Sequence, residues 1–354
     1  MSRWLTAVML GGLLVLPTMV HSQRRSPGRP DPTLTRLTDA AQQGQRESDK
    51  TLRWIGHFMK GAEGHTYVPY TLTIDAKRGT FETVSVYVRV AQAPVYDAER
   101  RHNIYGNNAA PLPAGAQVAT APEPTVLANA GANLAGARRI FEDAFRIDTT
   151  HAADSRVLRG AMTLRPGTYD VYVAVEDRAR GSDTPNAVVR QRVVVPDFSQ
   201  PGLSLSSILL VERLEALASP LKNNERAAYP YALGAMNLVP RLHAEFRQHE
   251  TLSIACLVYG AMPDDAGKPA VDVRYRLVRE GFAADRVLGT TGPEPLDRTT
   301  LPADFDLRAG HQLAPTHTLP LMSYDPGEYR LVIAVADRRT TASVEDQVRF
   351  RILP

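Results

Sequence analysis

The chain of 354 residues has a single cysteine, Cys256. One thiol cannot form an internal disulfide, and its isolation excludes every Cys-x-x-Cys redox or zinc motif. Cys256 stands inside the apolar run Leu252–Tyr259, which predicts a small buried core residue and not an exposed nucleophile. The fold must therefore be stabilised by burial of apolar surface, for which a chain of this length is ample.

Common catalytic and nucleotide-binding patterns are also missing. The sequence contains no Gly-x-Ser-x-Gly elbow, no His-Glu-x-x-His, no Walker loop and no Gly-x-Gly-x-x-Gly. His249-Glu250 begins a zincin-like motif, but Ser253 stands where the second histidine would be needed. These absences predict a protein that is not an enzyme and has no catalytic residue and no cofactor. Carboxylates from distant strands would leave no such pattern, so an enzyme with an unrecognised site stays open as an alternative.

Metal sites have little support. His243 and His249 are six residues apart, as are His311 and His317, and this spacing brings neither pair into close contact on one element. Asp264–Lys268 resembles a fragment of a calcium loop but lacks the spaced acidic ligands, so a turn is the preferred interpretation. We therefore predict no metal site.

The net charge and the aromatic content are both low, which bears on binding to nucleic acid and to polysaccharide. The 41 Lys and Arg nearly balance the 38 Asp and Glu, which leaves a net charge of +3 and no basic stripe. Nucleic acid is therefore excluded as a partner. Aromatic residues make up 7% of the chain, few for a face that stacks sugars, and the two tryptophans are Trp4 and Trp54.

The N-terminus has the features of a secretory signal peptide. Arg3 precedes the apolar run Leu5–Val20, and Val20-His21-Ser22 permits cleavage after Ser22. We predict residues 1–22 as a signal peptide and a mature chain that is exported, either periplasmic or extracellular. The apolar run is too short for a stable transmembrane anchor, and no later segment is apolar enough to span a bilayer.

One segment occurs twice. Residues 164–178 and 324–338 share Pro-Gly-x-Tyr, then alternating apolar residues, then Asp-Arg, at a constant offset of 160 residues. Proline and glycine favour a tight turn, and the alternation that follows is typical of a strand with one buried face. A tyrosine at the start of such a strand resembles the tyrosine corner of immunoglobulin-like sandwiches. We therefore interpret Tyr169 and Tyr329 as structural residues.

The two copies are unequal upstream of this motif. Val84–Val90 matches Val271–Leu277 at an offset of 187 residues, so the first copy contains 27 extra residues. We place this insertion within 94–137, where Ala, Pro, Asn and Gly dominate. A long loop inside a compact domain is either functional or disordered. Its start gathers residue types that adapt well to binding partners, and we predict a candidate interaction loop with these residues: Tyr96, His102, Asn103, Tyr105, Asn107 and Asn108.

The pattern of short strands predicts an all-β fold of two tandem immunoglobulin/fibronectin-like β-sandwiches with a short N-terminal helix. The first sandwich is expected over 65–197 with the insertion at about 94–137, and the second over 203–354, joined by a short stiff connector. Residues 23–64 are expected to be a disordered tail and a leading helix over Leu34–Trp54, docked through Trp54 and Phe58. Leu203–Val211 starts the second sandwich, and period counting leaves open whether it continues as a helix through Glu212–Leu217.

Several segments resemble a group of poorly characterised exported bacterial proteins, in which tandem immunoglobulin-like modules can follow a von Willebrand factor A-type domain. The segments that carry the resemblance are Tyr67–Ile74, Val195–Ser199, Lys268-Pro269, Phe305–His311 and Pro326–Leu331. The resemblance covers most of residues 60–354 and implies the tandem sandwiches. The Asp-x-Ser-x-Ser motif of the A-type domain is absent here, so the resemblance implies neither metal-dependent adhesion nor a catalytic residue.

The sequence therefore favours a non-enzymatic exported interaction or assembly module at the bacterial cell envelope, with a protein partner there. The alternative is a glycan-binding accessory protein of an envelope hydrolase or polysaccharide system. The two hypotheses differ in the partner expected at the insertion or at a sandwich face.

Overall fold

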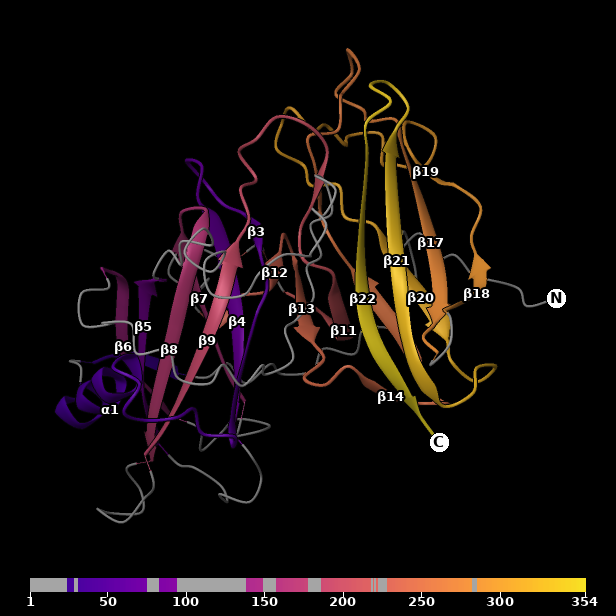
Figure 1. The fold of residues 1–354 in the computed structure, drawn as a ribbon. Helices are drawn as coiled ribbons and strands as arrows, with labels where there is room; N and C mark the ends of the chain where they lie inside the picture. The colour runs from indigo at the N-terminus through magenta and orange to yellow at the C-terminus, as the bar shows by residue number, and fades with distance from the viewer. Residues whose placement is uncertain are drawn as a thin grey trace, which may run out of the picture.

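The chain folds into two β-sandwiches in tandem, which confirms the predicted fold class (Figure 1). Module 1 is the sandwich before the connector at Pro196–Gly202, and module 2 is the sandwich after it. Among the described residues, one helix accompanies the strands. The computed structural model describes residues 24–28, 31–74, 83–93, 138–148, 157–177, 186–217, 219, 221, 228–281 and 285–354.

Module 1 has an outer and an inner sheet, named by their distance from module 2. The outer sheet has the order β1-β6-β5-β8-β9, and in the inner sheet β4 pairs with β2, β3 and β7. Neighbouring strands are antiparallel throughout. The strands are β1 Arg24–Pro27, β2 Leu52–Gly56, β3 Met59–Lys60, β4 Thr66–Ile74, β5 Thr83–Gln92, β6 Arg139–Asp148, β7 Val157–Leu164, β8 Gly167–Asp177 and β9 Ala187–Val195.

Module 2 repeats this plan with more short strands. Its inner sheet has the order β12-β13-β11-β15-β20. Its outer sheet has the order β14-β22-β21-β17-β18, and β19 also pairs with β17 in this sheet. Strands β10 and β16 form a separate two-stranded sheet. The strands are β10 Ser204–Leu205, β11 Leu209–Ala216, β12 Ala232–Leu233, β13 Met236–Pro240, β14 Glu245–Arg247, β15 Thr251–Ala255, β16 Val258–Tyr259, β17 Val271–Arg279, β18 Arg286–Thr290, β19 Glu294–Leu296, β20 Thr316–Pro320, β21 Gly327–Asp337 and β22 Ser343–Leu353. The open choice for 203–217 is thus settled in favour of a strand.

Strand register shows that the sequence repeat is also a structural repeat. Val84 on β5 lies opposite Asp177 on β8, and Val271 on β17 lies opposite Asp337 on β21. At the other end of the same strand pairs, Gln92 lies opposite Tyr169 and Arg279 opposite Tyr329. Both offsets found in the sequence are therefore kept along the whole length of the paired strands.

Each Pro-Gly-x-Tyr motif forms the expected tyrosine corner. The Tyr169 hydroxyl donates to the Arg165 carbonyl at 3.0 Å, and the Tyr329 hydroxyl donates to the Asp325 carbonyl at 2.6 Å. The intervening glycines have φ of 152° and 156°, values that residues with a side chain rarely adopt. The glycine thus lets the chain turn sharply enough for the tyrosine to reach back four residues.

The leading helix is shorter than predicted, and its docking residues differ. Helix α1 spans Pro32–Gln42, with Asp31 as N-cap accepting a hydrogen bond from the Thr33 amide at 2.9 Å. Leu52–Gly56 is strand β2, and Trp54 is buried in the core of module 1. The prediction over Leu34–Trp54 was wrong because apolar residues at 52 and 55 fit helical spacing, whereas burial alternates there with period two.

Helix α1 covers the face of the outer sheet of module 1 that points away from the core. Leu34 and Ala41 of the helix pack with Tyr87 on β5 and Tyr172 on β8. Beneath the helix lies Arg89, fully buried, which donates to Asp39 at 2.5 Å and Gln42 at 3.1 Å on α1 and to Glu142 on β6 at 3.0 Å. The helix is thereby attached to the sheet by apolar packing and by one buried guanidinium.

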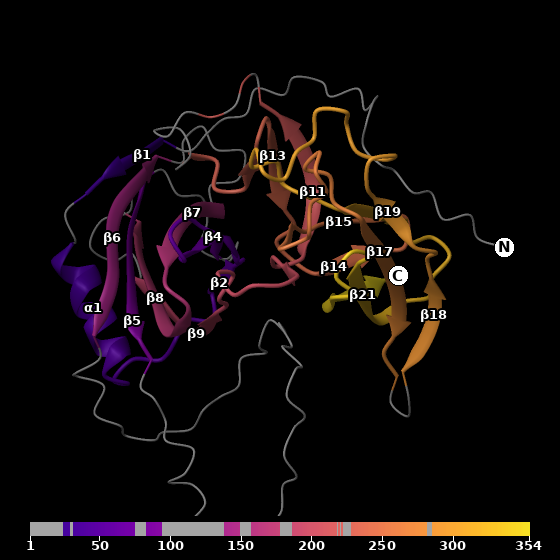
Figure 2. The same ribbon diagram turned by 90° about the horizontal axis from the view of Figure 1, so that it is seen from above.

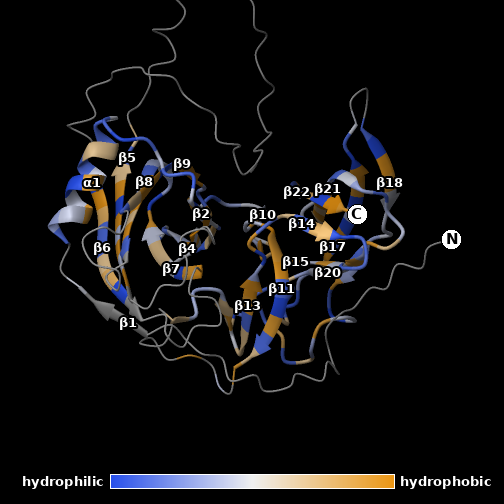
Figure 3. Ribbon diagram, turned by 90° about the horizontal axis from the view of Figure 1, so that it is seen from below, coloured by the Kyte–Doolittle hydropathy of each residue, from blue (hydrophilic) through white to orange (hydrophobic). Residues whose placement is uncertain are grey.

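The four main sheets lie in layers, as the view from above shows (Figure 2). Strand β11 of the inner sheet of module 2 carries both hydrophobic and hydrophilic residues (Figure 3), and its buried residues lie on both faces. Leu210 packs in the core of module 2, whereas Leu209 and Val211 pack toward module 1. An apolar cluster joins the two inner sheets, and we call it the junction: Met59 and Tyr67 from module 1, with Leu209, Val211, Tyr231, Leu238, Ala255 and Leu257 among its members from module 2.

Candidate functional site

The predicted interaction loop falls outside the described residues. This holds for each of the six residues singled out: Tyr96, His102, Asn103, Tyr105, Asn107 and Asn108. What the structure places is the base of the loop, because β5 ends at Gln92 and its partner β6 begins at Arg139. The signal peptide over 1–22 also lies outside the described residues.

The base of the loop lies beside the tyrosine corner of module 1. The Gln92 amide donates to the Arg138 carbonyl at 3.0 Å, and the Ala93 amide donates to the Thr168 carbonyl at 3.0 Å. In module 2 the equivalent amide of Glu280 donates to the Glu328 carbonyl at 2.9 Å, and a short connector over 280–285 then leads to β18. One strand pair thus carries a connector of very different length in the two modules.

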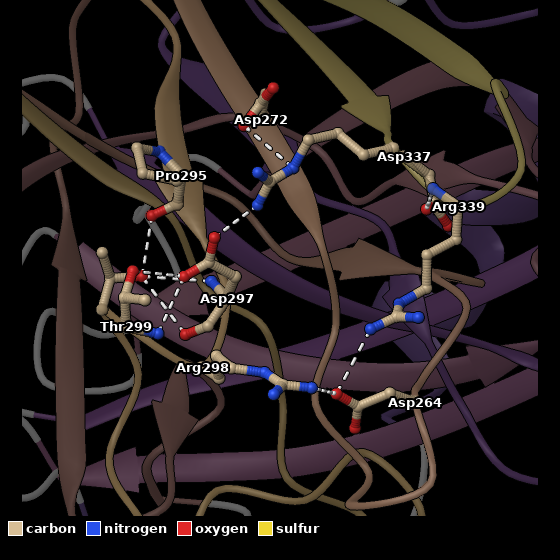
Figure 4. A network of polar contacts seen from close by, with 10 residues as sticks. Asp264, Asp272, Pro295, Asp297, Arg298, Thr299, Asp337 and Arg339 are labelled. Atoms are coloured by element: carbon tan, nitrogen blue, oxygen red, sulfur yellow. Dashed lines mark hydrogen bonds and ion pairs between the residues drawn. The ribbon is translucent and has the colours of Figure 1, made fainter.

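Charged residues gather at one end of module 2, and Figure 4 shows how they pair. Asp264 forms ion pairs with Arg298 at 2.8 Å and with Arg339 at 3.2 Å. Arg338 pairs with Asp297 and lies 3.4 Å from Asp272. Hydrogen bonds from Thr299 and then Arg338 lower the pKa of Asp297 to about 2.

Two further groups complete this network. The buried carboxylate of Asp337, at the end of the second repeat, accepts from the amides of Met262 and Arg339, each at 2.8 Å. The buried ammonium of Lys268 donates to the carbonyls of Pro302 and Ala303, each at 2.8 Å. The network ties several loops together and neutralises its own charges, so we interpret it as structural and not as a binding site.

Residues 264–268 form the turn that was preferred over a calcium loop. The Gly267 amide donates to the Asp264 carbonyl at 2.9 Å, and one Asp264 carboxylate oxygen accepts from the Lys268 amide at 2.8 Å. The lysine amide is the largest cause of the lowered pKa of Asp264. The carboxylate is therefore occupied by donors from its own turn and by two arginines.

Three of the four histidines considered as metal ligands have separate surroundings. His243 contacts Arg53 at 3.2 Å, and His311 accepts from the Asp306 amide at 3.0 Å. His317 is buried and stacks on Tyr275 with ring centroids 4.0 Å apart. Within the described ranges, no group of three or more His, Cys, Asp or Glu side chains is placed to hold a metal ion.

Cys256 is buried in the core of module 2, and burial raises the pKa of its thiol to about 12. A thiol that stays protonated at neutral pH is a poor nucleophile. No described helix is long and apolar enough to cross a bilayer.

The junction gathers polar groups that sequence reasoning did not single out. His57 Nδ1 of module 1 lies 3.1 Å from the hydroxyl of Tyr231 in module 2, and their rings meet edge to face at 5.5 Å. The same hydroxyl lies 3.3 Å from Thr71 Oγ1 on β4. Burial lowers the pKa of His57 to about 4 and raises the pKa of Tyr231. Both side chains are therefore neutral at pH 7.

Backbone groups of the segment 57–60 extend this contact. The Phe58 amide donates to Ser207 Oγ at 2.8 Å, and the Ser207 amide donates back to the Phe58 carbonyl at 2.9 Å. The Lys60 amide donates to the Tyr259 hydroxyl at 3.0 Å. A short segment of module 1 is thus hydrogen-bonded to module 2 at three successive points.

Arg159 on β7 is one of the charged residues of this region. It lies opposite Thr71 in the inner sheet of module 1, and its Nε is buried without a hydrogen-bond partner among the described residues. Burial is the main cause of its lowered pKa. Tyr231 acts in the opposite direction, and Arg213 on β11 lowers the pKa further. Strand β4 is largely buried on both faces, but Thr71 and Thr73 interrupt the apolar pattern of one face, so its sequence is only a weak signal of burial on both sides.

Comparison with known proteins gives no family and no function. The sequence matches no described protein family and no curated protein. Among solved structures, a transglutaminase from red sea bream shows 8% identity over 92% of this chain and 34% of its own length, with a TM-score of 0.21. A β-glucuronidase from Bacteroides uniformis shows 12% identity over 81% of this chain and 26% of its own length, with a TM-score of 0.24. The chain thus spans about a third or less of either protein.

Proposed function

We propose that this chain is an exported, non-enzymatic interaction or assembly protein of the bacterial cell envelope, and that residues 94–137 contact its partner. The proposal rests on one contrast between two equivalent strand pairs. Strands β5 and β17 have the same register with their partners, yet the first is followed by a long insertion and the second by a short connector. A long loop kept on an otherwise matching frame is the usual place for a binding function.

Two further observations support a role in binding rather than chemistry. The described charged residues of module 2 pair mainly with one another and with backbone groups, so they contribute to holding loops in place. The junction packs the two modules against each other, so the base of the loop belongs to a wide, ordered body. Export itself rests on the N-terminal sequence, as argued above.

The decisive experiment exchanges the loop for its own counterpart. In the chain from Gln23 onward, residues 94–137 are replaced by the sequence of the short connector, 280–285. Both forms carry a photo-crosslinker at position 139, which is exposed at the base of the loop, and are incubated with native envelope. The proposal expects a discrete protein crosslink that is lost on loop exchange while the fold is retained.

The same pair of proteins separates this proposal from its alternatives. Loop-dependent binding on a glycan array, without a protein crosslink, would favour the glycan-binding accessory protein. An unchanged crosslink after loop exchange would contradict the role of residues 94–137. A control pair with the crosslinker at exposed Arg349, on the outer sheet of module 2, reports any nonspecific capture.

A further inference from the structure

The short segment His57–Lys60 of module 1 forms several hydrogen bonds with module 2. His57, Phe58 and Lys60 each bond a group of module 2: Tyr231, Ser207 and Tyr259 respectively. Of these groups only the imidazole changes its charge between pH 4 and pH 7. The strength of this contact is therefore coupled to one proton-binding site.

The surroundings of His57 do not favour a positive charge. No described carboxylate forms an ion pair with it, and the charged group that acts on its partner Tyr231 is the guanidinium of Arg159. The acidic residue Glu215 on β11 is already held by Arg213 at 2.8 Å and by Asn237 at 2.8 Å. The charged and titratable groups that face this contact are Arg159 from β7, Arg213, Glu212 and Glu215 from β11, and the phenols of Tyr67 and Tyr70 from β4.

We propose that the junction is a pH-sensitive contact, closed while His57 is neutral and loosened when His57 is protonated. A protonated imidazole would add a second positive charge next to Tyr231, on which the guanidinium of Arg159 already acts. Separating the modules would expose His57 to water, where a positive charge costs little. The expected response is a local opening of the junction and not the unfolding of either sandwich.

The sign follows from the pKa values. His57 has a pKa of about 4 in the closed junction and 6.5 when it is exposed. The open form therefore binds more protons between these values, so closure is strongest above pH 6.5 and weakens as pH falls toward 4. Between pH 7.5 and pH 5 the open fraction is expected to rise by up to about 30-fold.

Module 2 has no comparable net response, because two of its interior groups oppose each other. Burial lowers the pKa of His317 to about 4 and raises the pKa of Asp346 to about 6. As pH falls, protonation of Asp346 stabilises the folded module. Protonation of His317, which its buried position resists, destabilises the folded module. Acid is therefore expected to act on the junction before it acts on the core of module 2.

Hydrogen exchange of single backbone amides tests the proposal in the chain from Gln23 onward. The amides of Phe58, Lys60 and Ser207 report on the junction, since each donates to a group of the other module. The amides of Val173 and Ile333, central in the two outer sheets, report on the sandwiches. After correction for intrinsic exchange, the junction amides should lose up to about 30-fold protection between pH 7.5 and pH 5, with the sheet amides unchanged.

Two variants make the result specific. His57→Asn keeps a polar atom near Tyr231 but does not titrate, so its junction amides should show no more pH dependence than its sheet amides. His65→Asn is the matched control, because His65 Nδ1 contacts only the nearby Glu63 carbonyl at 3.1 Å and should leave the wild-type response intact. The same loss of protection in His57→Asn, or no loss in the wild type, would overturn the proposal.

Direct titration of His57 keeps the proposal testable even if His57→Asn does not fold. The imidazole resonances of the unmodified chain should give a His57 pKa well below 6.5. A His57 pKa at or above 6.5 would show that the junction does not resist protonation, and the proposal would fail.

Discussion

The two modules share their strand framework but finish their outer faces in different ways. Arg89 on β5 and Arg276 on β17 occupy equivalent register positions, opposite Tyr172 and Val332. In module 1 helix α1 covers the arginine completely, whereas in module 2 Arg276 pairs with Glu345 while 42% of its side chain is exposed. The same residue is thus a buried anchor in one copy and a surface ion pair in the other, depending on a segment outside the repeat.

The largest expected difference between the modules comes from removing these two arginines. Arg89→Ala should destabilise the protein by about 3–5 kcal/mol, because it empties a fully buried position and removes the guanidinium that bonds both Asp39 and Glu142. Arg276→Ala should cost about 0–1 kcal/mol, as exposed ion pairs usually do. Urea unfolding of both variants measures the two losses of unfolding free energy. Equal losses would contradict the different roles of the two arginines.

The sequence could predict the repeat and its strands because their signals are local. Period-two alternation and the Pro-Gly turns lie within a dozen residues of one another, and the tyrosine corner closes over four residues. The role of Arg89 could not be predicted, since its partners Asp39 and Gln42 lie 50 and 47 residues away along the chain. Nothing local distinguishes it from Arg276.

The contact at the junction could not be predicted from the sequence for a similar reason. His57 and Tyr231 are 174 residues apart, and their contact depends on which sheet faces meet. Strand β4 is largely buried on both faces, but Thr71 and Thr73 on one face do not show what covers it. The candidate loop was predicted from a mismatch in repeat length, and the structure tests only where it begins and ends.

The next difference lies inside the sandwiches. Val189 on β9 and Asp346 on β22 are equivalent, opposite Val173 and Ile333, and burial raises the pKa of Asp346 to about 6. The folded protein therefore disfavours the carboxylate above pH 6, and the contribution of Asp346 to stability rises as pH falls from 6 toward 3.8. Asp346→Asn should stabilise the protein by about 1–2 kcal/mol at pH 7.5, allowing for partial access of solvent, and by almost nothing at pH 4.

Glu345→Gln on the same strand is the control for this prediction. Its side chain is exposed, so its effect should be small at either pH. Urea unfolding at the two pH values provides the comparison, and a gain from Asp346→Asn that persists at pH 4 would show that charge burial is not its cause.

The smallest expected effects test where the modules are alike. Tyr169→Phe and Tyr329→Phe each remove one hydroxyl that bonds a carbonyl four residues back, and each should cost about 1 kcal/mol. Tyr324→Phe serves as a control, because the Tyr324 hydroxyl makes no hydrogen bond to the described residues. Thermal or urea unfolding measures the two losses of stability. Clearly different losses in the two variants would contradict the structural equivalence of the repeats.

The central claim is that the junction holds two copies of one module as a single layered body, and a distance measurement tests it most directly. Spin labels at exposed positions 36 on α1 and 349 on β22, in a Cys256→Ala background, span all four sheets. Double electron–electron resonance at pH 7.5 should give one narrow distance distribution. A broad or multiple distribution in the folded protein would show that the modules move independently and would contradict the claim.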